Sequence, residues 1–169
     1  MAKDYTDQVL AQWGHARPDL DTSALGILNR AVRLATHIHK RDERLLQESG
    51  LQPWAYEVLA ALRRQGTPYQ LTPTELRKAT LLTSGGMTNR LDRLESAGWI
   101  ERSPDPADGR GVYVRLTARG RKIVDRALEL RLESAAVLLA PLSLADRRKL
   151  AGLLRQLLLP LSSRSPGML

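Results

Sequence analysis

Residues 72–98 read TPTELRKATLLTSGGMTNRLDRLESAG, and this stretch decides the fold. Thr72 and Glu75 have the spacing of a capping box, in which each side chain accepts a hydrogen bond from the other residue's backbone N–H. Pro73, directly after the cap, suits the first position of a helix. Together these residues predict a short helix over 73–79.

A second helix is expected after a short turn. Thr83 or Ser84 can cap it, and it should run to Ala97 and close at Gly98. A short helix, a turn and a second helix form a helix-turn-helix, whose second helix lies in the major groove of DNA and contacts base edges.

The period of the sequence changes after this helix. Residues 99–102 and 112–116 alternate in twos, and Pro104, Pro106 and Gly109 lie between them. This pattern predicts a β-hairpin with a long loop. The fold class is therefore mostly α with a small β-hairpin wing, a winged helix-turn-helix.

Amphipathic helices are expected on both sides of the hairpin and the helix-turn-helix, over 4–15, from Asp21 or Thr22 to 48, over 53–64, over 117–141 and from Ser143 to Pro160. The outer helices are too rich in leucine to stay exposed, which predicts a dimer interface built from both chain ends. We divide the chain into N-terminal helices with a dimerisation helix, a DNA-binding domain, C-terminal dimerisation helices and a flexible tail, at 1–48, 49–118, 119–161 and 162–169.

The composition excludes several classes of protein. The 169 residues include no cysteine, which rules out disulfides and thiolate metal sites, so a reducing cytoplasm is expected. The start of the chain lacks the apolar stretch of a signal peptide, and the longest apolar run, 135–142, falls far short of the ~20 residues that span a bilayer. No GxSxG motif, phosphate loop, paired carboxylates or His-rich ligand set is present, so we expect neither an enzyme nor a bound cofactor or metal.

The positive charge is concentrated in the middle of the chain. Lys and Arg number 26 against 18 Asp and Glu, a net charge of +8. Residues 60–122 hold twelve of the basic residues and six of the acids, so +6 of the +8 lies there. Such a stretch is either a solvated face or a surface for an anionic partner such as DNA.

The second helix of the helix-turn-helix separates into two faces. At about 100° per residue, Met87, Leu91 and Leu94 share the inner face. Asn89 lies on the opposite face with Arg93 at its edge, and these two side chain types pair with adenine and guanine respectively. A plain solvated face is the alternative.

Arg90 lies about 60–70° from the centre of the apolar face, so it is expected to be half-buried. A half-buried guanidinium needs an anionic partner or ligand. A salt bridge to Glu57, to Glu95 or to the hairpin serves as well as a ligand. Asp92 is expected to orient Arg93.

The tip of the hairpin carries Arg110, which can enter a narrow minor groove where the negative potential is enhanced. Asp108, two residues away, can hold the guanidinium in register. Solvated loop charges are the alternative.

The run 72–119, with Asp-Gly-Arg at the wing and VYVRLT after it, resembles the MarR family of homodimeric winged-helix regulators, whose motifs cover about 25–158. The resemblance implies Asn89 and Arg93 at the major groove and Arg110 at the minor groove, supported by Asp108. The full set of residues predicted to bind DNA is Ser84, Gly85, Thr88, Asn89, Arg93, Asp108 and Arg110.

A narrower resemblance, carried by the first helix, RPDLD at 17–21, LRRQGTPY at 62–69 and RLDRLESAGW at 90–99, is to the PecS-like, urate-responsive branch. It implies a ligand site of Trp13, Glu57, Arg90 and Arg102. Trp13 would stack on a planar ring and the two arginines would bind an anionic oxygen. Glu57 departs from the branch, which has Asp there. Packing of Trp13 in a core or dimer interface, and a phosphate contact by Arg102, are the alternatives.

The sequence thus predicts a cytoplasmic, homodimeric transcriptional regulator, a repressor that binds a pseudo-palindromic operator and is released by a small anionic aromatic effector such as urate. Its partners would be double-stranded DNA, a second copy and that effector, with no membrane. The alternative is a nucleoid-type DNA-binding or protein-interaction module that tolerates any sequence and takes no ligand.

Overall fold

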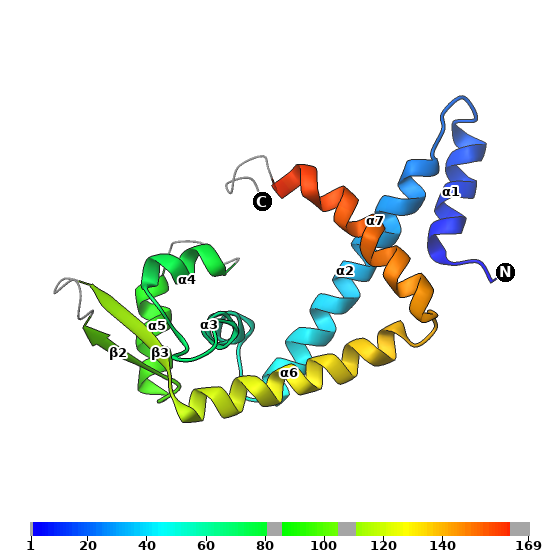
Figure 1. Cartoon of the computed structure of the whole chain (residues 1–169). Coiled ribbons are helices and arrows are strands. Elements are labelled where there is room, and N and C mark those ends of the chain that lie inside the picture. Colours follow the sequence, from blue (N-terminus) through cyan, green and yellow to red (C-terminus); the bar gives the residue numbers. More distant parts are fainter. Residues whose placement is uncertain (1, 81–85, 105–110, 163–169) are drawn as a thin grey trace. The chain divides into compact units, whose positions relative to one another are not determined.

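The computed structural model describes residues 2–80, 86–104 and 111–162. The chain divides into two compact units, Met1–Ala127 and Leu128–Leu169. Within the described residues the elements follow the order α1 Tyr5–Ala16, α2 Ser23–Glu48, α3 Pro53–Arg64, β1 Gln70–Leu71, α4 Pro73–Ala79, α5 Met87–Ser96, β2 Ile100–Pro104, β3 Val112–Leu116, α6 Ala118–Leu139 and α7 Leu144–Ser162 (Figure 1).

The helix-turn-helix forms where the sequence predicts it. Helix α4 has the predicted bounds, and its capping box is present: the Thr72 hydroxyl accepts from the Glu75 N–H at 3.2 Å, and the Glu75 carboxylate accepts from the Thr72 N–H at 2.8 Å. Helix α5 begins at Met87 after Gly86, whose φ is +87°. The N-cap is therefore Gly86, not Thr83 or Ser84, because glycine adopts this left-handed backbone without steric cost.

The hairpin is part of a three-stranded antiparallel sheet in the order β1-β3-β2. Strands β2 and β3 pair from Ile100↔Leu116 to Pro104↔Val112, as the alternation predicts. Strand β1 adds Gln70 opposite Arg115 on the other side of β3. The sequence did not indicate β1, because two residues are too few to show an alternating pattern.

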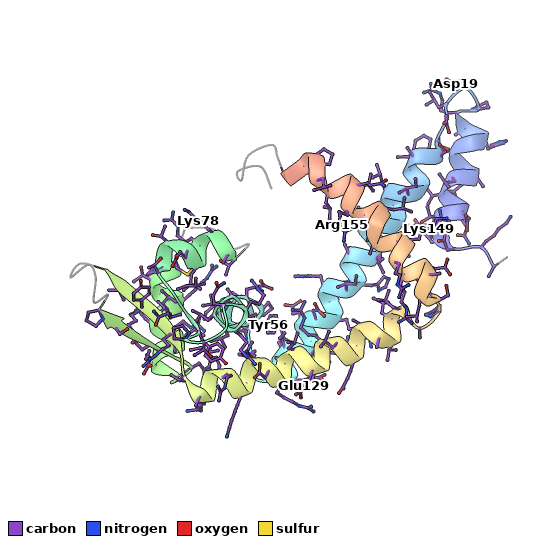
Figure 2. All side chains as sticks on the ribbon, viewed as in Figure 1. Asp19, Tyr56, Lys78, Glu129, Lys149 and Arg155 are labelled. Atoms are coloured by element: carbon purple, nitrogen blue, oxygen red, sulfur yellow. The ribbon has the colours of Figure 1, made fainter. Side chains whose placement is uncertain are left out.

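The hydrophobic core of the first unit is built around α3. Leu59 and Leu62 on this helix are fully buried, and they share the core with Leu76 of α4, Leu94 of α5 and Val114 of β3. Figure 2 shows Tyr56 on α3, where it is buried, and Lys78 on the exposed side of α4. The core therefore fixes α4, α5 and the sheet to one another.

Helix α6 starts against the turn that joins α5 to β2. The Thr117 hydroxyl donates to the Gly98 carbonyl at 2.8 Å and accepts from the Gly120 N–H at 3.0 Å. One turn further along, Asp125 pairs with Arg63 of α3 at 2.7 Å. These contacts join the start of α6 to α3 and to the turn between α5 and β2.

Helix α7 differs from the prediction at its end. Pro160 was expected to terminate it, yet the helix continues to Ser162. The fixed φ of proline is helical, so the chain can continue through Pro160, although the residue lacks an N–H donor and its ring crowds the carbonyl four residues earlier.

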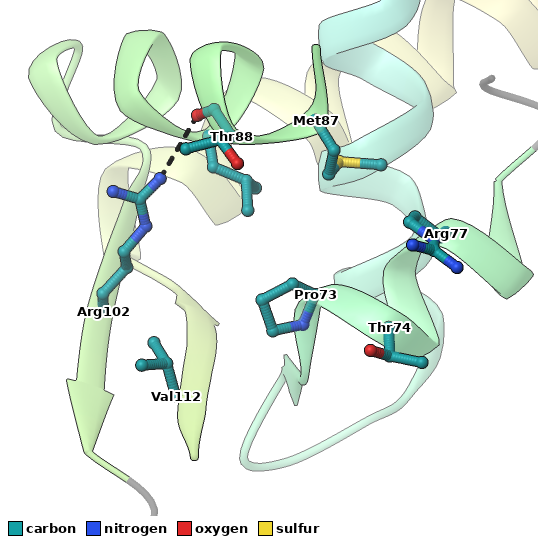
Figure 3. A pocket seen from close by; sticks show the side chains of 8 residues that line it. Pro73, Thr74, Arg77, Met87, Thr88, Arg102 and Val112 are labelled. Atoms are coloured by element: carbon teal, nitrogen blue, oxygen red, sulfur yellow. Dashed lines mark hydrogen bonds between the residues drawn. The ribbon is translucent and has the colours of Figure 1, made fainter. Parts of the chain in front are cut away.

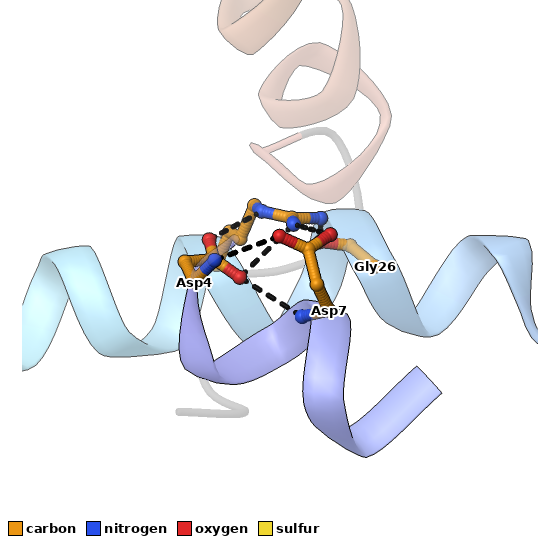
Figure 4. A network of polar contacts seen from close by, with 4 residues as sticks. Asp4, Asp7 and Gly26 are labelled. Carbon is orange, nitrogen blue, oxygen red and sulfur yellow. Dashed lines mark hydrogen bonds and ion pairs between the residues drawn. The ribbon is translucent and has the colours of Figure 1, made fainter. Parts of the chain in front are cut away.

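Arg30 of α2 binds the residues at the start of helix α1 (Figure 4). Its guanidinium binds Asp4 at 2.8 Å and Asp7 at 2.7 Å, the two residues that form the capping box of α1. It also donates to the Gly26 carbonyl at 3.1 Å on its own helix. One side chain on α2 therefore holds the first turn of α1.

We expect Arg30→Met to loosen α1 without unfolding the winged helix, because it removes both ion pairs at once. Hydrogen exchange read by mass spectrometry should show faster exchange over 5–16 and unchanged exchange in α3 and α4. Arg41→Met, an exposed arginine further along α2, is the matched control. Unchanged exchange in α1 would show that Arg30 does not hold it.

The ion pairs of Arg30 with Asp4 and Asp7 also predict that the docking of α1 on α2 depends on pH. Hydrogen bonds from Arg30, then from the Asp7 backbone, hold the pKa of Asp4 below its ordinary value of 3.8. A lowered folded-state pKa stabilises the docked helix above the unfolded value and loses that contribution as the pH falls through the folded value. Docking of α1 should therefore stay constant down to this ordinary value and weaken below it.

Candidate nucleic-acid interface

Helix α5 presents the two faces that its sequence predicts. Met87, Leu91 and Leu94 are buried in the core, which confirms the predicted inner face. Asn89 and Arg93 are exposed, as is Thr88. A helix held by one apolar face and polar on the other can enter a major groove. The predicted contacts Ser84 and Gly85 lie outside the described residues.

Arg93 is supported by an aromatic ring that the sequence analysis did not single out. Its guanidinium lies over Trp54, near the start of α3, 5.1 Å from the ring centroid. Such a contact contributes about 0.5–1 kcal/mol at an exposed site. Trp54 thus restricts where the Arg93 side chain can go while leaving its donors exposed.

Arg102 of β2 reaches across to α5. Its Nη1 lies 2.6 Å from Asp92 and 3.1 Å from Glu95, and its backbone N–H donates to Glu95 at 3.1 Å. Its Nη2 donates to the Thr88 carbonyl at 3.4 Å, the bond drawn in Figure 3. Asp92 was expected to orient Arg93, but it pairs with Arg102, because the side chain of β2 reaches along the helix beside it.

Arg90 is half-buried, as its place on the helix predicts. Its Nη1 is fully buried and has no hydrogen-bond partner among the described residues. None of the salt bridges considered from the sequence, to Glu57, to Glu95 or to the described part of the hairpin, forms. A buried donor without a partner is costly, so this atom calls for an acceptor that the described residues do not supply.

The other two residues of the predicted ligand site lie on helices. Trp13 is on α1 and is 47% exposed, and Glu57 is partly buried on α3. Within the described residues, no hydrogen bond or ion pair joins Trp13, Glu57, Arg90 and Arg102. The Trp13 ring is therefore exposed and the Nη1 atom of Arg90 still lacks an acceptor among the described residues, whereas Arg102 is already bonded to α5.

A crevice of about 330 Å³ opens between the starts of α4 and α5 and the wing (Figure 3). Pro73, Met87 and Val112 give it apolar walls, and Thr88 and Arg102 give it polar ones. Local sequence patterns do not indicate this crevice, because its lining residues come from four elements, α4, α5, β2 and β3.

The described part of the wing is the strand pair in which β2 ends at Pro104 and β3 begins at Val112. Arg115 of β3 pairs with Glu101 of β2 at 2.6 Å, both with exposed side chains. The predicted minor-groove residues Asp108 and Arg110 lie outside the described residues.

The described part of the chain shows neither a membrane-spanning helix nor a cluster of metal-binding side chains. None of its helices is long and apolar enough to cross a membrane. No group of three or more His, Asp or Glu side chains there could hold a metal ion.

Comparison with known proteins agrees with this geometry. The model of the MarR family matches residues 49–111. The HTH-type transcriptional regulator PecS of Dickeya dadantii is 32% identical over 86% of this chain and 88% of its own length. The multiple antibiotic resistance protein MarR of Escherichia coli is 38% identical over 64% of this chain and 78% of its own.

A solved structure shows the same fold. A variant of Escherichia coli MarR complexed with operator DNA matches with a TM-score of 0.62 at 29% identity, over 86% of this chain and 97% of that one. The chain belongs to the MarR family of winged helix-turn-helix transcriptional regulators, which bind DNA.

Proposed function

We propose that this protein is a cytoplasmic repressor that binds a pseudo-palindromic operator as a homodimer and is released by a small anionic aromatic ligand such as urate. The observation that carries the DNA part is the exposed polar face of α5, held rigidly on the core by Leu91 and Leu94. The MarR variant that matches this chain was crystallised with operator DNA, which supports the same use of α5 here.

Each groove is assigned its own residues. Asn89 would pair with adenine and Arg93 with guanine in the major groove. Arg110, held by Asp108, would enter the minor groove at the tip of the wing. Thr88 at the start of α5, together with Ser84 and Gly85, which precede the helix in the sequence, would approach the phosphates and bases.

The homodimer is supported by exposed apolar side chains in both units. On α2, Ile27 and Val32 are each 66% exposed, and on α7, Leu158 and Leu161 are 58% and 67% exposed. Monomeric proteins rarely leave such faces uncovered. In the dimer, the two copies of α5 would lie about 34–36 Å apart to fit successive turns of the major groove.

Selection from a random duplex library tests the DNA part. The protein should enrich a pseudo-palindrome whose half-sites have their centres about 10–10.5 base pairs apart, or a multiple of that. A nucleoid-type module would enrich no sequence, and that result would overturn the proposed operator binding.

The ligand part rests on Arg90. Its buried Nη1 has no acceptor among the described residues, and an anionic oxygen would supply one. Trp13 on α1 would stack on a planar ring, and Glu57 would accept a ring N–H. Arg102 already binds two carboxylates, so a ligand that uses it must displace them.

A thermal-shift panel of urate, other purines and salicylate-like phenols tests the ligand. A ligand at a hundred times its Kd should stabilise the protein by about 2.7 kcal/mol. Trp13→Ala and Arg90→Ala should lose this stabilisation, and Lys78→Ala, on the exposed side of α4, should keep it. If no compound stabilises the wild type, the ligand part of the proposal is wrong.

A further inference from the structure

Arg102 is placed to link the wing to the recognition helix α5. From β2 it contacts Thr88, Asp92 and Glu95, which follow one another at four and three residues along the helix. Residues at this spacing share one face of a helix. The guanidinium therefore lies along about two turns of α5 and is only 28% exposed.

The bonds of Arg102 add to the covalent connection between α5 and β2. At the turn, the Trp99 N–H donates to the Leu94 carbonyl at 3.0 Å, which fixes the start of β2 to the end of α5. Arg102 lies further along the strand, so its bonds set how the rest of β2 lies against the helix. A wing and a helix that enter two grooves at once need this relative placement fixed.

The charges on α5 give Arg102 a second effect. The helix MTNRLDRLES carries Arg90 and Arg93 but also Asp92 and Glu95, so by itself it has no net charge. The two carboxylates have side chains that are 54% and 40% exposed, on the helix that approaches DNA. Arg102 neutralises them, and without it they would repel the phosphates.

We propose that Arg102 is a positioning residue for DNA binding, which holds the wing on α5 and neutralises Asp92 and Glu95 without contacting DNA itself. This rests on the proposed use of α5 and the wing as the DNA-binding surface. It makes the carboxylates of Asp92 and Glu95 part of the binding machinery, although neither of them is expected to touch DNA.

The test is a double-mutant comparison on the duplex that the wild-type protein enriches from the random library. Arg102→Met should weaken binding about tenfold, a change of about 1.4 kcal/mol. The same substitution in a protein carrying Asp92→Asn and Glu95→Gln should change binding by less than about threefold, because its partners are gone. Arg115→Met, which breaks the ion pair with Glu101 within the wing, is the matched control and should also stay within about threefold.

The salt dependence distinguishes positioning from a phosphate contact. A lost phosphate contact reduces the slope of log K against log salt by about 0.9. In the protein carrying Asp92→Asn and Glu95→Gln, where no carboxylates remain to repel the phosphates, Arg102→Met should leave this slope unchanged. Equal losses of affinity with and without the carboxylates of Asp92 and Glu95, together with a reduced slope, would show that Arg102 binds phosphate and would overturn the proposal. Unchanged binding in Arg102→Met would also overturn it.

Two further measurements keep the test decisive. If Arg102→Met fails to fold, Arg102→Lys replaces it, because lysine keeps the charge but lacks the planar fork that reaches both carboxylates. If the wild type enriches no duplex, the proposed function fails, and the link is tested alone by hydrogen exchange over 88–96. Faster exchange in Arg102→Met than in Arg115→Met supports the link, and equal exchange refutes it.

Discussion

Gly120→Ala is expected to lower the free energy of unfolding by about 3 kcal/mol, the upper end of the usual range for an overpacked site. A Cβ at Gly120 would meet the backbone carbonyl of Trp99, well inside van der Waals contact. That carbonyl accepts from the Thr117 N–H at 3.1 Å, so it cannot move without breaking the start of α6. Backbone atoms held in this way move aside less readily than a flexible side chain would.

Gly152→Ala is the matched control for this substitution. Gly152 also lies inside a helix, α7, but apart from the adjoining backbone of that helix nothing lies within 4 Å of the position of its added Cβ. Alanine there should be neutral or stabilise the protein by up to about 1 kcal/mol. Urea unfolding followed by circular dichroism measures both changes, and equal values for the two glycines would show that the turn at Trp99 has room to adjust.

Arg93→Ala is expected to weaken binding to the selected duplex by about 1–3 kcal/mol, which is about five- to 150-fold in Kd. The reason is the loss of a guanidinium that can donate two parallel hydrogen bonds to guanine. Its contact with the Trp54 ring, at 5.1 Å, is weaker than such a pair, so the ring can guide the side chain without preventing it from reaching the base. Binding should also tolerate base changes at the contacted position.

Lys78→Ala separates this effect from general electrostatics. Lys78 is an exposed basic residue on α4, outside the recognition helix (Figure 2). Its loss should affect the selected duplex and a random duplex alike, because a charge near phosphates carries no sequence information. Arg93→Ala should weaken the selected duplex more than the random one, and a uniform loss would show that Arg93 contacts no base.

Most of the fold follows from local patterns in the sequence. The capping box at Thr72 and Glu75 and the glycine at 98 mark helix ends by chemistry that needs no tertiary contact. The cap of α5 could not be predicted in this way, because Thr83 and Ser84 have capping side chains while Gly86 acts through its backbone alone. Pro160 was wrongly predicted to end α7, because the fixed φ of proline is itself helical and a helix can continue past it despite the lost N–H donor and the crowded carbonyl.

The candidate site was predictable where one helix determines it. The position of Arg90 on its own helix was enough to predict half-burial, and the structure confirms it. The partner of Asp92 was not predictable, because it depends on how β2 lies against α5. The stacking of Arg93 on Trp54 likewise joins residues whose meeting is decided by packing in the core.

The ratio of the Kd for a random duplex to the Kd for the selected duplex, measured at physiological salt, tests most directly that α5 and the wing recognise a specific operator. We predict a ratio of about a thousand or more, as for other specific DNA-binding proteins. A ratio near one, with a steep salt dependence on both duplexes, would contradict it and would identify a protein that binds DNA through charge alone.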